Sequence, residues 1–212
     1  MRFFNTNVYD LAESIVASGY PMLSEYDVEK VQSDIDTVRH NLKFPERKFF
    51  GNKHILRATK LANTPSGSGH ASFLKGVLVS SDVQMTLKVM KEFQRYVFAQ
   101  IISSTSTMHR ITKFDLEKCC DKFTDPRILD IVKELVEIYN ENPTSENFER
   151  IVSNIPTGLE LTFRFTTNYL SLRNMYHQRK DHRLEEWNKD FSTWIKSLPL
   201  AKEFIVGIPK ND

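Results

Sequence analysis

Few glycines, no long apolar run and no phosphate-loop or metal-binding motif mark what this sequence lacks. Only 7 of its 212 residues are glycine. Neither GxGxxG nor GxxxxGK[ST] occurs, so a Rossmann or P-loop nucleotide site has no motif support. No stretch approaches the roughly 20 apolar residues that a membrane helix requires. The histidines show neither HxxxH nor HExxH spacing, so we expect no metal site.

Cysteine and charge are also limited. Cys119 and Cys120 are adjacent, so they cannot cross-link the fold, and they indicate a reducing compartment. Residues 1–20 include Asp10 and Glu13 and contain no secretory signal. A formal net charge of +2 excludes a strongly basic nucleic-acid binder by bulk charge, although a local basic patch stays open. We expect a soluble cytoplasmic protein that does not bind membranes.

What the chain does contain is phenylalanine, with 15 residues, and 40% hydrophobic residues overall. A Phe-rich, Gly-poor chain of this length is consistent with helices packed on a small sheet. We predict an α/β or α+β fold, mostly helical, as a single domain over residues 1–212, with a helical N-terminal segment over residues 1–66 and a core over residues 67–197. Gly and Ser in Asn63–Gly69 predict a flexible loop and candidate ligand lid, and Asn41–Gly51 is a further predicted loop.

Periodicity predicts the individual elements. Helices are expected over Val8–Ala17, Glu25–Val38, Lys53–Ala62, Met85–Ile102, Asp125–Tyr139, Glu146–Val152, Asn168–Arg179 and Arg183–Ser197. Strands are expected over Phe73–Val83 and Leu159–Phe165. The last helix carries aromatic residues at helical spacing, which predicts a core or subunit-interface face, with cofactor stacking as the less favoured interpretation: Trp187, Phe191 and Trp194.

One helix carries the most informative spacing. Asn168 and Arg179 are 11 residues apart, about three helical turns, so both side chains share a face and lie roughly 16 Å apart. An amide and a guanidinium at that separation could hold the two ends of a nucleotide-sized ligand. The alternative is that Arg179 only interacts with the helix dipole at the C-terminus.

Other polar clusters have a structural and a functional interpretation. On the predicted helix Met85–Ile102, one face carries Glu92 and Arg95, which form either a ligand-facing wall or a solvated ion pair. Residues 103–107 are five consecutive hydroxyl residues, followed by Met108, His109 and Arg110, a composition that suits phosphate or ribose contacts or simply a polar loop. His70, after the Gly/Ser loop, is more often structural than catalytic when considered alone.

Together these segments resemble the flavin-dependent thymidylate synthases over about residues 68–187. The residues that carry the resemblance are His70-Ala71-Ser72-Phe73, Arg95 25 residues later, Glu92 three residues before it, Ile155-Pro156, and Thr166, Asn168, Ser171-Leu172, Asn174 and Arg179. The chain also resembles short phage proteins related to these synthases, which share Ser-x-Ser-Thr-Met-His and Tyr-His-Gln-Arg segments. A host cytoplasm is then the expected location.

The resemblance implies a reaction and the residues for it. It implies C5 methylation or hydroxymethylation of dUMP or dCMP with FAD, and NADPH and methylenetetrahydrofolate as co-substrates, in a homotetramer with sites between subunits. Arg179 would be catalytic and bind the pyrimidine. Glu92, Arg95 and Ser106 would bind the nucleotide. His70, Asn168 and Asn174 would bind flavin.

The sequence also departs from the signature of that family. Tyr96-Val97 follows Arg95 where the family has His-Arg, Leu170 replaces an arginine, and Val152 stands where an arginine precedes the Leu-Pro. His109, Arg110 and Arg173 are candidates to replace some of this lost charge. A catalytically degenerate nucleotide-binding or assembly protein is therefore the rival hypothesis, and a nucleic-acid binder using residues 177–183 is disfavoured by the near-neutral charge.

Overall fold

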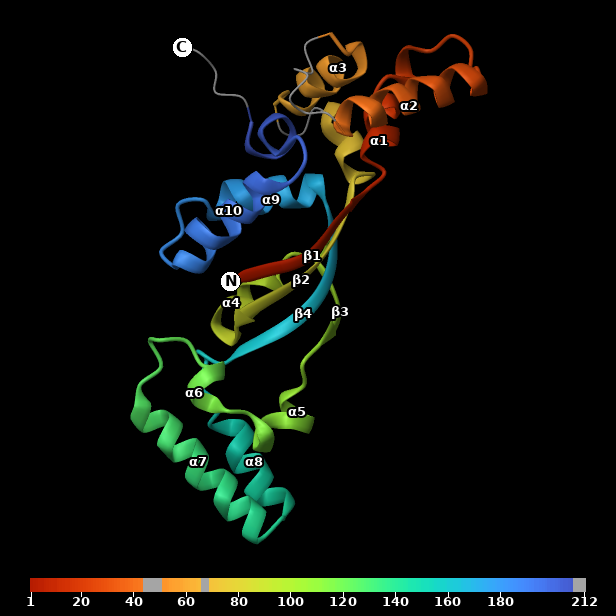
Figure 1. Cartoon of the computed structure of the whole chain (residues 1–212). Coiled ribbons are helices and arrows are strands. Elements are labelled where there is room, and N and C mark those ends of the chain that lie inside the picture. The colour runs from red at the N-terminus through yellow and green to blue at the C-terminus, as the bar shows by residue number, and fades with distance from the viewer. Residues whose placement is uncertain (44–50, 66–68, 208–212) are drawn as a thin grey trace. The chain divides into compact units, whose positions relative to one another are not determined.

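The computed structural model of the chain describes residues 1–43, 51–65 and 69–207 (Figure 1). Of the predicted loop Asn41–Gly51, residues 44–50 lie outside these ranges and residues 41–43 belong to a helix; of the predicted lid Asn63–Gly69, residues 66–68 lie outside them. The chain divides into two compact units: Met1–Phe4 with Ser81–Phe165, here unit 1, and the described residues of Asn5–Ser80 with Thr166–Asp212, here unit 2. The single-domain organisation, with a helical segment over residues 1–66 and a core over residues 67–197, stays a prediction.

The described strands form one antiparallel sheet in the order β1-β2-β4-β3. Its members are β1 (Arg2–Tyr9), β2 (Leu78–Thr86), β3 (Gln100–Ser104) and β4 (Glu160–Asn168). Helices make up 58% of the structure, so the predicted α+β class, mostly helical around a small sheet, is confirmed. β1, β2 and β4 each contribute residues to both units.

The central strands have one buried face and one polar face. In β4, Leu161, Phe163 and Phe165 are buried, whereas the residues between them are exposed or half-buried. This is the period-2 pattern of a strand packed on one side only. In unit 1 the fully buried ring of Phe165 meets Phe93 edge-on at 5.1 Å and Phe3 at 6.4 Å between ring centroids.

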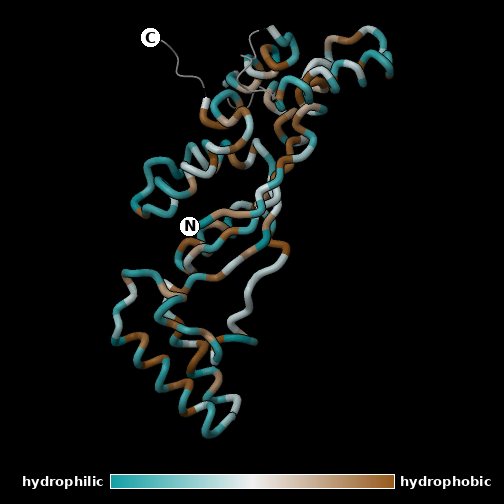
Figure 2. Tube along the Cα trace, in the orientation of Figure 1, coloured by the Kyte–Doolittle hydropathy of each residue, from teal (hydrophilic) through white to brown (hydrophobic). Residues whose placement is uncertain are grey.

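The helices of unit 1 follow from strong capping signals. They are α4 (Leu87–Phe93), α5 (Thr107–Arg110), the 3₁₀ turn η3 (Ile111–Lys113), α6 (Leu116–Cys119), α7 (Pro126–Glu141) and α8 (Ser145–Ser153). Asp125 caps α7 by accepting from the Arg127 N–H at 3.0 Å, just before Pro126. α7 packs on α8 through apolar residues that recur along both helices (Figure 2). The predicted helices at Asp125 and Glu146 are confirmed.

The prediction of one long helix over Met85–Ile102 is wrong. Met85 lies in β2, α4 stops at Phe93, and the chain turns through Gln94–Ala99, where the Ala99 N–H bonds the Tyr96 carbonyl at 2.8 Å. β3 then begins at Gln100. The apolar spacing that suggested a helix was coincidental, since Val97 is 78% exposed. The proposed wall of Glu92 and Arg95 is therefore not a single helix face, since Arg95 lies beyond the end of α4.

Unit 2 is built from helices at both ends of the chain. From the N-terminal side come α1 (Leu11–Ala17), η1 (Tyr20–Met22), α2 (Val28–Lys43), α3 (Lys53–Ala62) and η2 (His70–Lys75). From the C-terminal side come α9 (Tyr169–Arg179), the π-helix η4 (Glu186–Phe191), α10 (Ser192–Ser197) and the π-helix η5 (Lys202–Val206). α3 matches its predicted bounds, and Asn52 caps it through the His54 and Ile55 N–H groups.

Several predicted boundaries in unit 2 need correction, and α2 also ends at Lys43 rather than at Val38. Val8 lies in β1 and not in a helix, because Asp10 adopts a left-handed conformation (φ 56°) that separates β1 from α1. α2 starts at Val28 rather than Glu25, since the Asp27 carboxylate accepts from the Lys30 N–H at 3.0 Å and caps it. Phe73 lies in the 3₁₀ helix η2 and not in a strand.

A buried histidine joins α2 to α3. His54 is 7% exposed; its Nε2 lies 3.1 Å from Asp34 Oδ1, and its Nδ1 lies 3.2 Å from Arg57 Nη2. A guanidinium can only donate, so Nδ1 accepts and Nε2 carries the proton toward Asp34. Arg57 also donates to the Ile15 and Val16 carbonyls of α1. This network ties three helices together around a neutral imidazole.

We expect acid to destabilise the protein through His54. Burial, followed by Arg57 and Lys53, lowers the pKa of His54 below its usual 6.5, against the opposing effect of Asp34. The unfolded chain then binds the proton more tightly, so stability is complete above about pH 6.5 and falls as the pH drops below it. Thermal melts between pH 7.5 and 5 should show His54→Gln, which keeps both hydrogen-bonding roles, losing less stability than the wild type. An equal loss would contradict this, with the exposed His109→Gln as the control.

Candidate functional site

The helix α9 is the centre of the predicted site, and Asn168 starts it. The Asn168 Oδ1 accepts from the Ser171 N–H at 2.9 Å and caps the helix as β4 ends. Tyr169, Leu172, Met175 and Tyr176 are buried, because α9 packs against η2, η4, α10 and η5. The Tyr169 hydroxyl donates to the Pro199 carbonyl at 2.7 Å. α9 is therefore a rigid support within unit 2.

Arg179, the last residue of α9, lies against an aromatic ring. Its Cζ lies 5.0 Å from the centroid of the Trp187 ring, within the range of a cation–π contact. The ring itself is fully buried, and it meets Phe191 edge-on at 5.2 Å. The predicted core face of the last helix is confirmed, since Trp187, Phe191 and Trp194 are all buried. Arg179 thus has a defined environment and is not simply a surface residue at a helix end.

The other two residues predicted to bind flavin lie in the same unit. His70 is exposed at the start of η2, which packs against α9. Asn174 is exposed on α9 and lies five residues before Arg179, so the two side chains point about 140° apart around the helix axis, whereas Asn168 lies before the helix at the end of β4. The structure therefore brings the elements carrying His70, Asn168, Asn174 and Arg179 into one unit, although Asn174 and Arg179 lie on different faces of α9.

Arg173, a candidate replacement for lost phosphate-binding charge, has a structural role. Its Nη1 donates to the Ala62 carbonyl at the end of α3. The negative end of that helix dipole favours such a cation. Burial lowers the pKa of Arg173. This interaction links α9 to α3 and leaves Arg179 as the residue of α9 on which a nucleotide-binding role rests.

The residues predicted to bind nucleotide lie in unit 1. Glu92 is half-buried in α4, and Arg95 follows it in the turn, where its N–H bonds the Glu92 carbonyl at 3.3 Å. Ser106 is on a different element, where its hydroxyl caps α5 by accepting from the His109 N–H at 3.3 Å. Arg95, His109 and Arg110 are exposed. The structure thus brings Glu92 and Arg95 together, and it gives Ser106 a local capping role.

Sequence reasoning missed the polar face of the sheet. In unit 1 the Arg164 guanidinium donates to Asp82 Oδ1 at 3.1 Å. In unit 2 the Ser80 and Thr166 hydroxyls are 2.9 Å apart. These residues come from β2 and β4 and alternate with buried ones. The alternation of apolar and polar residues over Leu78–Thr86 is the signal for this face, but the predicted strand began five residues too early.

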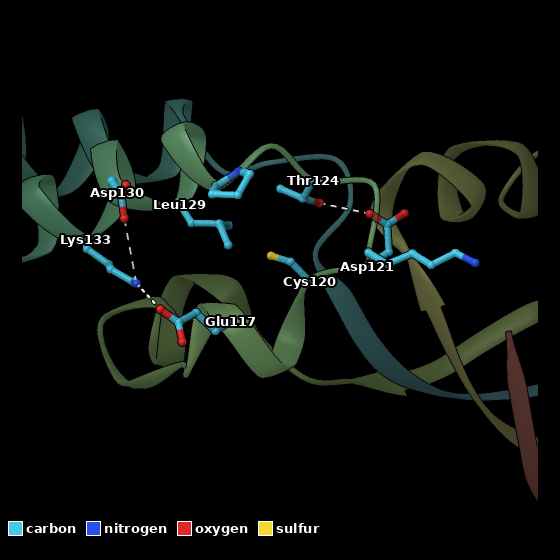
Figure 3. A pocket seen from close by; sticks show the side chains of 9 residues that line it. Glu117, Cys120, Asp121, Thr124, Leu129, Asp130 and Lys133 are labelled. Atoms are coloured by element: carbon cyan, nitrogen blue, oxygen red, sulfur yellow. Dashed lines mark hydrogen bonds and ion pairs between the residues drawn. The ribbon is translucent and has the colours of Figure 1, made fainter.

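A pocket of about 310 Å³ opens in unit 1 beside α6 and α7 (Figure 3). Lys133 bridges to Glu117 at 2.5 Å, and Thr124 donates to Asp121 at 2.9 Å. The Cys120 thiol lines the pocket, and burial, together with nearby negative charge, raises its pKa to about 11. A protonated thiol is a poor nucleophile. The pocket includes none of the predicted site residues.

The described residues contain no group of three or more His, Cys, Asp or Glu side chains placed to hold a metal ion. Among the helices of residues 1–43, 51–65 and 69–207, none has the length and apolar character needed to cross a membrane.

Comparison with solved structures identifies the fold. The chain is similar to the flavin-dependent thymidylate synthase ThyX of Helicobacter pylori in complex with FAD and dUMP, with a TM-score of 0.71 and 14% identity over 99% of this chain and 100% of that one. A second structure of the same enzyme with FAD and dUMP gives 0.69 and 12%, covering 97% of each chain. No family model and no curated protein matches the sequence. The chain therefore has the flavin-dependent thymidylate synthase fold.

Proposed function

We propose that the protein is a flavin-dependent thymidylate synthase-like enzyme that methylates or hydroxymethylates C5 of dUMP or dCMP. The observation that carries the proposal is the match of the whole chain to structures holding FAD and dUMP. Arg179 supports it independently, since it is the guanidinium at the end of α9 and is held against a buried ring. The resemblance implies methylenetetrahydrofolate as the one-carbon donor and NADPH as the reductant.

The residues around α9 suit an anionic cofactor such as FAD. The sequence of α9 contains no Asp or Glu and carries two arginines and a histidine. Asn174 and His177 are exposed along it, and exposed His70 lies on the helix η2 packed beside it. Amide and imidazole groups can donate to or accept from the heteroatoms of a flavin ring. When bound, FAD supplies hydride chemistry, while Asn168, Asn174 and His70 would hold and orient it.

Arg179 is the residue to which we assign the pyrimidine. A guanidinium is always charged and offers a planar fork of donors that matches a ring carbonyl and its neighbour. Such a donor stabilises the negative charge that develops on the ring when a nucleophile adds, and it makes the ring electrophilic. Glu92, Arg95 and Ser106 are assigned to the nucleotide, with Arg95 as the exposed cation among them.

A nucleotide-binding protein without catalysis is the second candidate. Three observations favour it: Asn168 uses its Oδ1 in a helix cap, Ser106 caps α5, and Arg173 binds the end of α3. Each of these groups makes a hydrogen bond within the protein, so its position is explained without a role in catalysis. Turnover, and not binding, separates this candidate from the enzyme.

We also propose a homo-oligomer, a tetramer of D₂ symmetry, located in the cytoplasm. Exposed large apolar side chains support it, among them Met22 at 86%, Val97 at 78% and Phe98 at 68%. Symmetric association would cover such surface. Light scattering at micromolar concentration decides between this assembly and a monomer of 24.7 kDa.

FAD titration tests the cofactor assignment directly. Adding FAD to the apo protein should quench flavin fluorescence and raise the melting temperature. At a free FAD concentration 100 times Kd, the added stability is about 2.7 kcal/mol. The purified protein should be yellow if it retains the cofactor. No stabilisation by FAD, FMN or their reduced forms would remove the flavin from the proposal.

A further inference from the structure

We propose that Trp187 is the positioning residue of Arg179: its buried ring fixes the guanidinium that receives the pyrimidine. The inference rests on the proposed function, because it gives Trp187 a role in nucleotide binding through Arg179. The contact is the 5.0 Å approach of the Arg179 Cζ to the centroid of the Trp187 ring.

Trp187 is itself held in place from several directions. Its backbone N–H donates to the Leu184 carbonyl at 3.0 Å, and its carbonyl accepts from the buried Ser192 hydroxyl at 3.4 Å. The ring is fully buried and contacts Phe191 at 5.2 Å and His182 at 6.5 Å, both edge-on. Backbone and side chain are therefore both constrained, so the ring is a fixed surface.

The local backbone explains why this ring reaches Arg179. The turn after α9 is closed by the His182 N–H on the Arg179 carbonyl at 3.0 Å and by the Asn188 amide on the His182 carbonyl at 2.6 Å. Trp187 then falls in the π-helix η4. π-helical turns are rare and are found frequently at functional sites. The chain thus folds back so that the start of η4 lies over the end of α9.

The chemistry of the contact leaves a role for ligand binding. A cation–π attraction acts through the ring face and the charge, whereas hydrogen bonds use the N–H groups in the guanidinium plane. A side chain held this way loses less freedom when a ligand binds it. Misplacement of a binding group by about 1 Å can cost about 10²-fold in rate. Trp187 would therefore affect nucleotide affinity without touching nucleotide.

Substitution of Trp187 tests the proposal. Calorimetry should compare dUMP and dCMP binding by the wild type, Trp187→Phe and Trp187→Leu at equal distance below each melting temperature. Phenylalanine keeps an aromatic face and should stay within about threefold of the wild-type affinity, whereas leucine should weaken binding about tenfold. Trp194→Phe, which alters a ring that contacts Phe191 on the side away from Trp187 in the sequence, should bind like the wild type.

A fluorescence measurement keeps the test decisive if Trp187→Leu does not fold. The chain has two tryptophans, so Trp194→Phe leaves Trp187 as the only one. Adding dUMP or dCMP should change the Trp187 emission of the Trp194→Phe variant, but not that of the Trp194→Phe/Arg179→Gln variant. Equal affinities of the folded Phe and Leu variants, or unchanged emission on nucleotide binding, would overturn the positioning role. If the wild type itself binds neither dUMP nor dCMP, the proposed function and this inference both fail.

Discussion

Arg179→Lys is expected to keep the fold and lose the nucleotide chemistry. Lysine retains the positive charge and can still approach the Trp187 ring, but it lacks the planar donor fork. Losing one such electrostatic donor costs roughly 10²–10³ in rate. We therefore expect dUMP- or dCMP-dependent flavin reoxidation to fall by about this factor while the melting temperature stays near that of the wild type.

The matched control for this substitution is Arg183→Lys. Arg183 is exposed in the turn after α9 and has no assigned role. Binding of dUMP and dCMP should also be compared with that of the unphosphorylated nucleosides, since the nucleotide assignment requires a preference for the phosphate. If Arg179→Lys and Arg183→Lys behave alike, Arg179 is a structural residue and the assigned site is wrong.

The two substitutions separate the donor fork of Arg179 from its positioning by the Trp187 ring. Arg179→Lys removes the fork and keeps the charge, and Trp187→Leu removes the ring and keeps the fork. If both variants lose binding, nucleotide binding requires a guanidinium that the ring holds in the correct orientation. A loss with lysine alone would mean that the ring serves only the core.

The elements that sequence predicted best are those with local signals. α3 and α7 have capping residues, Asn52 and Asp125, directly before an apolar repeat, and their predicted extents agree closely with the structure. β3 had no such signal. Its pairing depends on β4, as in the bond from the Thr105 N–H to the Thr162 carbonyl at 2.9 Å, 57 residues along the chain. A non-local hydrogen bond of this kind leaves no periodicity in the strand itself.

The geometry of the candidate site could be predicted less well. The shared face of Asn168 and Arg179 was inferred from helical spacing, but Asn168 ends β4 with an extended backbone (φ −135°, ψ 166°) and caps α9, so that spacing does not apply to its side chain. The cation–π contact of Arg179 could not be predicted either, because it depends on the turn at residues 180–185 and on a π-helix. Capping by Asn168 and Ser106 was also hidden, since Asn and Ser are common both at helix starts and in ligand sites.

The largest effect on stability is expected from Phe165→Ala. Phe165 is fully buried in β4, and its ring meets Phe93 and Phe3 edge-on. Removing a buried phenylalanine side chain costs the transfer of the ring from water and leaves a cavity, together about 3–5 kcal/mol. The loss of two aromatic pairs adds to this. Urea denaturation followed by circular dichroism should show a much lower midpoint.

Phe123→Ala is the matched control because the same side chain is removed from the opposite environment. Phe123 is 75% exposed, near the Lys88 and Lys122 ammonium groups. Its substitution should change stability by no more than about 0.5 kcal/mol, as for ordinary surface sites. A Phe165→Ala protein that unfolds at nearly the same urea concentration as Phe123→Ala would mean that β4 does not pack on Phe93 as described. The placement of the sheet in unit 1 would then be wrong.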